Sequence, residues 1–162
     1  MIIFINGSIN SGKSTVAKIL AEKLGQVALV EIDQLRDFIA WMPISEAVPI
    51  NLENAAAVIK NFIGRKINVI ATYPLSEKNY NYLMENLKDF QDEIKIFTLS
   101  PRLEAALKNR GTRELTDQEV ERIKYHYKIG IPNPSFGEII DNSNEMPEET
   151  ADKILQVINN LK

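Results

Sequence analysis

The feature that most constrains how this chain folds is a glycine-rich segment close to its start. Residues 7–14 read Gly-Ser-Ile-Asn-Ser-Gly-Lys-Ser and fit the pattern G-x-x-x-x-G-K-[ST]. An apolar run, 2–6, precedes the segment, and Lys13–Leu24 follows with apolar residues at helical spacing. Backbone N–H groups in such a loop turn inward around an anion, and the start of the helix adds its positive end. The sequence therefore predicts a strand, an anion-binding loop and a helix. The competing interpretation is a chance glycine-rich turn with Lys13 solvated.

The residue types in the loop point to the phosphates of a nucleotide. The ammonium of Lys13 can reach β- and γ-phosphate oxygens, and the Ser14 hydroxyl can ligate Mg²⁺. The guanine-reading motif Asn-Lys-x-Asp is absent from the sequence, which argues against a GTPase. The residues predicted to bind the nucleotide here are Gly7, Ser8, Asn10, Ser11, Gly12, Lys13, Ser14 and Thr15.

Short apolar runs alternate with segments of helical period along the whole chain. Later strands are predicted at 27–32, 67–72, 94–99 and 138–141. Helices are predicted at 13–24 and 52–63 and from Ser76, Ser100-Pro101, Thr116 and Pro147, where residues that cap or start helices stand. The least regular stretches, predicted to be loops, are 42–51, 108–116 and 129–137. Continuous apolar runs are typical of strands covered on both faces, so the sequence predicts a three-layer α/β domain with a mainly parallel sheet.

Length and composition exclude several classes of protein. The chain has 162 residues, which fits one domain spanning 1–162. Its 19 Lys and Arg against 22 Asp and Glu give a net charge of −3, so a nucleic acid partner is not expected. There are no cysteines, which removes disulfides and thiolate metal sites. No apolar run approaches the roughly 18 residues of a membrane span, and the start lacks the features of a signal peptide. We therefore expect a cytoplasmic protein with no membrane partner.

A second set of candidate residues follows the second predicted strand. Asp33 stands at the carboxyl end of that strand, on the edge where the glycine-rich loop lies in a parallel sheet. There Asp33 can accept a hydrogen bond from an acceptor hydroxyl, and Arg36, one helical turn on, can bind an anionic group of the same molecule. Trp41 is a candidate wall of the acceptor pocket, within a predicted acceptor-binding region of about 33–65. The competing interpretations are that Asp33 only caps a helix and that Trp41 packs in the core.

Polar and cationic residues later in the chain complete the candidate site. Arg110 and Arg113 flank a glycine in a predicted short lid, about 109–117, where positive charge can cover a transferring phosphoryl group. The alternative is that these arginines only favour a helix C-terminus. Asn142 follows the fifth run and can edge a purine or serve a turn. His126 is the only histidine, and it has no evident carboxylate neighbours for a metal site, so we expect a structural or surface residue.

The loop at 7–14, Asp33, the two lid arginines and the segment 141–143 together resemble the small P-loop kinases, the group of shikimate, gluconate, adenylate and chloramphenicol kinases. The resemblance covers nearly the whole chain. It implies a P-loop NTPase fold with a five-stranded parallel sheet in the order 2-3-1-4-5, flanked by helices and a short lid. It also implies ATP with Mg²⁺ as the phosphate donor and a small-molecule acceptor. Two positions depart from the pattern: Thr72 is neither glycine nor acidic, and Leu75 stands where adenylate kinases carry an arginine.

The residues and the resemblance together predict an ATP-dependent kinase of a small molecule. The residues assigned to it are Lys13, Asp33 and Arg113 for catalysis, Arg36 and Trp41 for the acceptor, Ser14 for Mg²⁺, and Arg110 and Asn142 with the loop for ATP. One alternative is a nucleotide-binding regulatory protein with weak hydrolysis, because no carboxylate for a metal follows the third strand. Others are a nucleoside monophosphate kinase or a polynucleotide 5′-kinase, whose Asp-x-x-Arg the segment 33–36 also resembles. The chain is expected to be a monomer or a weak homodimer.

Overall fold

The structure is a computed structural model that describes residues 1–108 and 114–160. Strands and helices alternate along the chain, as the sequence predicts. The strands are β1 (Ile2–Gly7), β2 (Val27–Glu31), β3 (Asn68–Thr72), β4 (Ile94–Leu99) and β5 (Glu138–Ile140). The helices are α1 (Lys13–Leu24), α2 (Ile44–Ile63), α3 (Glu77–Asn86), α4 (Leu103–Ala106), α5 (Asp117–Lys128) and α6 (Pro147–Asn160), with 3₁₀ segments η1 (Ile32–Ile39) and η2 (Lys88–Glu93).

All five strands run parallel in one sheet, in the order β2-β3-β1-β4-β5. This is the order that the resemblance implies, so that prediction is confirmed. β1 lies in the middle of the sheet and is in register with β3 and β4 on either side. Because the strands are parallel, the loops that follow β1, β2 and β3 all leave the sheet at the same edge.

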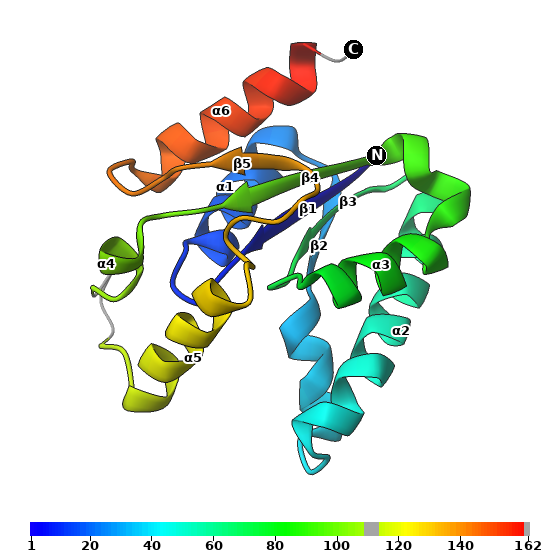
Figure 1. Cartoon of the computed structure of the whole chain (residues 1–162). Coiled ribbons are helices and arrows are strands. Elements are labelled where there is room, and N and C mark those ends of the chain that lie inside the picture. Colours follow the sequence, from blue (N-terminus) through cyan, green and yellow to red (C-terminus); the bar gives the residue numbers. More distant parts are fainter. Residues whose placement is uncertain (109–113, 161–162) are drawn as a thin grey trace.

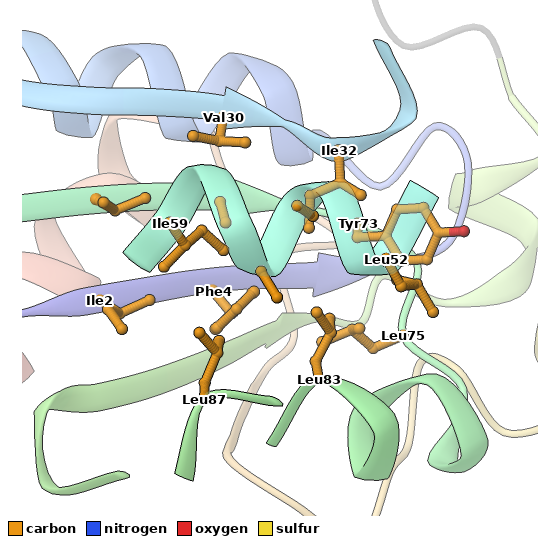
Figure 2. Packing of buried hydrophobic residues seen from close by; sticks show 14 of the residues in the cluster. Ile2, Phe4, Val30, Ile32, Leu52, Ile59, Tyr73, Leu75, Leu83 and Leu87 are labelled. Atoms are coloured by element: carbon orange, nitrogen blue, oxygen red, sulfur yellow. The ribbon is translucent and has the colours of Figure 1, made fainter. Parts of the chain in front are cut away.

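Helices cover both faces of the sheet (Figure 1). On one face a buried cluster joins β1 to α2 and α3, and Figure 2 labels Ile2, Phe4, Leu52, Ile59, Leu83 and Leu87 among its members. On the other face a second cluster joins the sheet to α1 and α6, and its members include Ile3, Ile5, Leu20 and Ile154. Successive side chains of β1 point to opposite faces, and both faces are buried. This is why the strand is a continuous apolar run in the sequence.

Several helix starts predicted from capping residues are confirmed. The Ser76 hydroxyl accepts a hydrogen bond from the Asn79 N–H at the start of α3. Thr116 and Glu119 form a reciprocal capping box at the start of α5. α6 begins at Pro147, as predicted.

The helix predicted from Ser100-Pro101 is wrong in its position. α4 begins at Leu103 and contains only four residues. The Ser100 N–H instead donates to the Ile140 carbonyl oxygen and so continues the pairing between β4 and β5. The chain therefore stays extended for longer at this edge of the sheet than the serine–proline pair suggests.

The stretch 42–51, predicted to be a loop, is largely the first part of α2. The helix begins at Ile44 and contains Pro49, which removes one backbone hydrogen bond. Ala47 is buried on its inner face, and the Asn51 side chain donates to the Ile32 carbonyl oxygen of η1 at 3.0 Å. These contacts offset the cost of the proline and fix η1 against α2. Neither α2 nor any other helix in the described part of the chain is long and apolar enough to cross a membrane.

Candidate functional site

The glycine-rich loop between β1 and α1 has a backbone that favours glycine at two positions. Gly7 has a φ of 146°, and a Cβ atom there would lie 2.7 Å from the Leu99 carbonyl oxygen. Gly12 has a φ of 95° and occupies the N-cap position of α1, where it offers no side chain to the helix. The first N–H groups of a helix have no partner within the helix, so this loop suits an anion such as a phosphate group.

The Lys13 side chain folds back over the loop. Its Nζ atom donates a hydrogen bond to the Ser8 carbonyl oxygen at 2.7 Å. Burial lowers the pKa of Lys13 to about 8, and the carboxylates of Asp33 and Glu31 oppose this shift. An anion bound in the loop favours the charged ammonium. Lys13 is therefore placed to change its protonation when a phosphate binds.

A carboxylate that the sequence analysis did not single out lies beside Ser14. The Ser14 hydroxyl donates to Glu31 Oε2 at 2.9 Å, and the Lys18 ammonium lies 3.8 Å from Oε1. Glu31 is the last residue of β2 and is in register with Thr72 at the end of β3. A carboxylate thus stands at this edge of the sheet although Thr72 cannot provide one. The available signal was an acidic residue next to the last residue of the second apolar run.

Ser14 and Glu31 together suit a magnesium ion. Hydroxyl and carboxylate oxygens are ligands that Mg²⁺ takes alongside water and phosphate oxygens. Within residues 1–108 and 114–160, no group of three or more histidine, aspartate or glutamate side chains is placed to hold a metal ion. A divalent ion at Ser14 and Glu31 would therefore depend on the phosphates of its ligand for part of its coordination.

A cavity of about 350 Å³ lies beside the glycine-rich loop. Its walls include Ile9, Asp33, Arg36, Asp37, Arg122 and His126. Ile9 belongs to the loop, Asp33 and Arg36 to η1, and Arg122 and His126 to α5. In Figure 1, η1 and α5 extend from the same end of the sheet. The structure therefore brings Asp33 and Arg36 together, as the sequence predicts, and adds two residues from a distant helix.

Asp33 lies among charges of both signs. Burial raises the pKa of its carboxyl group, and the charges of Lys13, Arg122 and Arg36 oppose that shift. The side chain still reaches solvent at the mouth of the cavity. η1 has Glu31, not Asp33, at its N-cap position, so the interpretation of Asp33 as a helix cap is wrong. Its carboxylate is free of a capping role and faces the cavity.

The Nε atom of Arg36 is a buried hydrogen-bond donor. It has no hydrogen-bond partner among the described residues. A buried donor left in this state costs about 1–3 kcal/mol. Arg36 lines the cavity, where its guanidinium group can bind an anionic group.

Two predicted residues stand apart from the cavity. The Trp41 side chain is 80% exposed and, within the described residues, does not line the cavity. The interpretation of Trp41 as a core residue is wrong, and its contact with an acceptor stays a prediction. Thr15 is exposed on α1. Arg110 and Arg113, and with them most of the predicted lid, lie outside the described residues.

Two asparagines, Asn10 within the loop and Asn142 outside it, connect the loop to neighbouring segments. Asn10 has a φ of 61°, and its Nδ2 donates to the carbonyl oxygens of Ala106 and Lys108, each at 2.8 Å. The Nδ2 atom of Asn142 donates to the Ser11 carbonyl oxygen at 2.9 Å. These bonds fix the loop against α4 and the segment after β5. The predicted contacts of both asparagines with a nucleotide stay predictions.

His126 contacts the loop through a side chain. Its Nδ1 atom lies 3.2 Å from the Ser8 hydroxyl oxygen, and both residues are buried. Burial lowers the pKa of His126 to about 4, and the positive charges of Lys13 and Arg122 act in the same direction. The imidazole is therefore neutral near pH 7. Sequence reasoning left His126 as a structural or surface residue, and its burial excludes the surface.

A larger cavity, of about 480 Å³, is lined by residues that include Lys95, Gly137 and Glu138. It shares no residue with the glycine-rich loop or with the cavity at Asp33. Size alone is therefore a poor guide to the site in this molecule. The charged groups and the loop backbone converge at the smaller cavity.

Comparison with known proteins gives one relative in sequence. The chain is 32% identical over 163 residues to a protein of Sulfurisphaera tokodaii described as "Putative adenylate kinase". The match covers 96% of this chain and 81% of the relative. No family model matches the chain.

Several solved structures are similar in fold. A sugar kinase from Janibacter sp. HTCC2649 superposes with a TM-score of 0.74 at 17% identity, covering 98% of this chain and 94% of that one. A gluconokinase from Sinorhizobium meliloti 1021 gives 0.74 at 16% identity, over 98% and 91% of the two chains. A shikimate kinase from Aquifex aeolicus gives 0.64 at 18% identity, over 99% and 97%. At these identities the likeness concerns the fold.

Proposed function

Because this chain belongs to the small P-loop kinases, we propose that it transfers the γ-phosphate of ATP to a small molecule that carries a hydroxyl or phosphate group. One observation carries the proposal. Asp33, Arg36 and Arg122 line a cavity that adjoins the glycine-rich loop. A donor in the loop and an acceptor in the cavity would thus be neighbours, which is the arrangement that phosphoryl transfer requires.

The donor is proposed to bind along the loop. Its phosphates would meet backbone N–H groups of the loop and the first turn of α1, and the Lys13 ammonium would contact the β- and γ-phosphate oxygens. The proposed ATP-binding residues are Gly7, Ser8, Asn10, Ser11, Gly12, Lys13, Ser14 and Thr15 in and next to the loop, with Arg110 and Asn142. Lys13 has the catalytic role of neutralising charge that develops on the transferring group.

Mg²⁺ is proposed to be held by Ser14 and Glu31 together with the phosphates. When bound, the ion would neutralise charge on the β- and γ-phosphate oxygens. In the free protein the Ser14 hydroxyl donates to Glu31, so the two oxygens already lie within 2.9 Å of each other. Glu31→Gln tests this assignment, because the amide keeps the size of the side chain and removes its charge. We expect that variant to need a higher Mg²⁺ concentration for the same activity.

The acceptor is proposed to bind in the cavity through two kinds of group. The carboxylate of Asp33 would accept a hydrogen bond from the acceptor hydroxyl and take its proton as the oxygen attacks the γ-phosphorus. The bond between the β–γ bridging oxygen and the γ-phosphorus then breaks, and ADP leaves. Arg36 and Arg122 would hold an anionic group of the acceptor. Trp41 and the lid arginine Arg113 complete the proposed set, at the acceptor and at the transferring phosphate respectively.

A second candidate function is transfer to a nucleoside monophosphate, as the description of the Sulfurisphaera relative suggests. Leu75 stands where the adenylate kinases that this sequence resembles carry a phosphate-binding arginine. Its side chain is 1% exposed and packs in the hydrophobic core (Figure 2). This position cannot bind a phosphate, and the candidate therefore ranks second.

The test is ADP release from Mg·ATP in the presence of a panel of acceptors. The panel contains shikimate, sugar acids, nucleoside monophosphates, phenicol and aminoglycoside antibiotics, and 5′-hydroxyl oligonucleotides. We expect one anionic class to stimulate release. Lys13→Ala should lower turnover by about a thousandfold, and Asp33→Asn by at least about a hundredfold. Lys23→Ala is the matched control, since Lys23 lies on the same helix and pairs with Asp152 at the surface.

One outcome would contradict the kinase function, and another would contradict only the role of Asp33. Tight ATP binding without stimulation by any acceptor would favour a regulatory protein with weak hydrolysis. Stimulation that survives in Asp33→Asn would remove Asp33 from the catalytic residues while leaving the kinase activity in place.

A further inference from the structure

α5 buries two side chains against the rest of the protein. Of its 12 residues, Ile123 and His126 are the buried ones. The Tyr127 hydroxyl adds a hydrogen bond to the Pro101 carbonyl oxygen at the end of the helix. Ile123 gives α5 apolar contact, which is not directional. A polar bond at His126 can fix the orientation of the helix more narrowly.

The partner of His126 is a residue of the glycine-rich loop. Ser8 Oγ lies 3.2 Å from His126 Nδ1, and the two residues are 0% and 4% exposed. The imidazole is neutral near pH 7, since burial and the charges of Lys13 and Arg122 disfavour its protonated form and lower its pKa. A neutral imidazole and a hydroxyl can share one hydrogen bond in either direction. Because the bond is buried, losing either partner leaves the other unsatisfied.

Arg122 lies one helical turn before His126 and faces the same cavity. Both side chains line it, and the positive charge of Arg122 acts on the Asp33 carboxyl group. Residues four apart lie on the same face of a helix. Any rotation of α5 that moves His126 away from Ser8 must therefore also move Arg122 relative to Asp33.

We propose that His126 is a positioning residue: its hydrogen bond to Ser8 holds α5 on the glycine-rich loop and thereby keeps Arg122 at the acceptor side of the site. The role of Arg122 in this inference rests on the proposed function. The hydrogen bond that joins α5 to the glycine-rich loop does not depend on the proposed function. His126 itself touches neither reacting group in this proposal. It couples the position of an acceptor-binding arginine to the loop that holds the donor.

The first arm of the test needs no substrate. Hydrogen–deuterium exchange of the peptide covering Asp117–Lys128 is compared in the full chain and in three variants: Ser8→Ala, His126→Leu and the double variant. We expect each single change to speed exchange in α5 about tenfold, the effect of one buried hydrogen bond. The double variant should exchange no faster than the faster single variant, because both changes remove the same bond. Exchange in α6 should not change.

A conservative substitution separates the bond from the bulk of the side chain. His126→Asn places an amide near the position of Nδ1 and should retain most of the protection of α5. His126→Leu has a similar volume but cannot bond to Ser8. Unchanged exchange in His126→Leu, or additive effects in the double variant, would overturn the inference. These results do not depend on whether an acceptor has been found.

The second arm uses the acceptor that stimulates ADP release in the panel. His126→Leu should raise the KM for that acceptor about tenfold and leave the KM for ATP within about twofold, and His126→Asn should restore the acceptor KM. Equal increases in both KM values would mean that His126 only supports the fold of the loop, and would overturn the positioning role. If no acceptor is found, the proposed function fails. The hydrogen–deuterium exchange experiment still decides whether His126 holds α5 on the glycine-rich loop.

Discussion

Asn6, at the end of β1, offers a sharp test of how this site is held together. Its side chain is fully buried, and all of its hydrogen-bonding capacity is used. Oδ1 accepts from the N–H groups of Gly7 at 2.7 Å and Leu75 at 2.8 Å. Nδ2 donates to Thr98 Oγ1 at 3.0 Å and to the Ile131 carbonyl oxygen at 3.4 Å. One amide thus connects the loop, the segment after β3, β4 and the segment after α5.

The cost of Asn6→Ala can be worked out from these bonds. The change leaves the N–H groups of Gly7 and Leu75 buried without that acceptor, at about 1–3 kcal/mol each. The Thr98 hydroxyl can rotate, and the bond to Ile131 is long, so these two contribute little. We therefore expect a loss of about 4 kcal/mol in the free energy of unfolding. With a urea m-value of about 2 kcal/mol/M, the midpoint should fall by about 2 M.

Equilibrium urea unfolding, followed by circular dichroism, measures this loss. Thr98→Val is the matched control, since it keeps the shape of the side chain and removes a single partner of Asn6. It should cost about 1 kcal/mol. A loss in Asn6→Ala no greater than that in Thr98→Val, at equal m-values, would refute the reasoning that the two backbone N–H groups carry the cost.

Three further predictions concern charge and exposure. Burial lowers the pKa of Lys13 to about 8, and a bound phosphate raises it, so ATP affinity should fall as the pH rises above 8. Calorimetry in buffers of different ionisation enthalpy should show that the protein takes up a proton when ATP binds near pH 8. This proton uptake should be absent in the Lys13→Arg variant. The pKa of His126 is lowered from 6.5 to about 4 in the fold, so the unfolded chain binds a proton first as the pH falls. The contribution of His126 to the free energy of unfolding should therefore be complete above pH 6.5 and decline by up to about 3 kcal/mol towards pH 4. Urea unfolding of the unchanged protein and of His126→Asn at several pH values measures this decline. Trp41 is the only tryptophan and is 80% exposed, so Trp41→Ala should change the free energy of unfolding by less than about 0.5 kcal/mol, and the native protein should show the red-shifted fluorescence of a solvated indole.

The sheet and its loop could be predicted because local patterns decide them. Strands buried on both faces are largely apolar, and β1 and the inner part of β3 are such runs. The start of α1 follows from Gly12 and Lys13, and the start of α5 from the capping box at Thr116. The first turns of α2 escaped prediction because Pro49 interrupts the helical pattern, while the compensating contact of Asn51 with Ile32 is tertiary.

The parts of the site that sequence reasoning missed depend on register and on distance along the chain. The search for a metal carboxylate was directed at the end of β3, where Thr72 stands. Only the pairing of β2 with β3 places Glu31 beside that position. Likewise nothing in a single helix connects His126 to Ser8, since their contact requires the packed fold. The single domain over 1–162, the cytoplasmic location and the monomer or weak homodimer stay predictions, because they depend on surroundings and surfaces more than on this site.

The charges around the cavity narrow the choice of acceptor. Asp33 and Asp37 face Arg36 and Arg122 there, so the formal charges of these four groups balance. A hydroxyl offered to Asp33 adds no charge, whereas the guanidinium groups of Arg36 and Arg122 can bind an anionic group of the acceptor. A hydrogen bond to a charged group contributes about 1.5–3 kcal/mol and one between neutral groups about 0.5–1.5 kcal/mol, and a difference of about 1.4 kcal/mol corresponds to a tenfold preference for the anionic ligand. We therefore expect sugar acids or phosphorylated hydroxyl compounds to stimulate ADP release more strongly than neutral antibiotics. The Arg36→Met variant should reduce that difference, because it removes the donor and keeps much of the apolar stem.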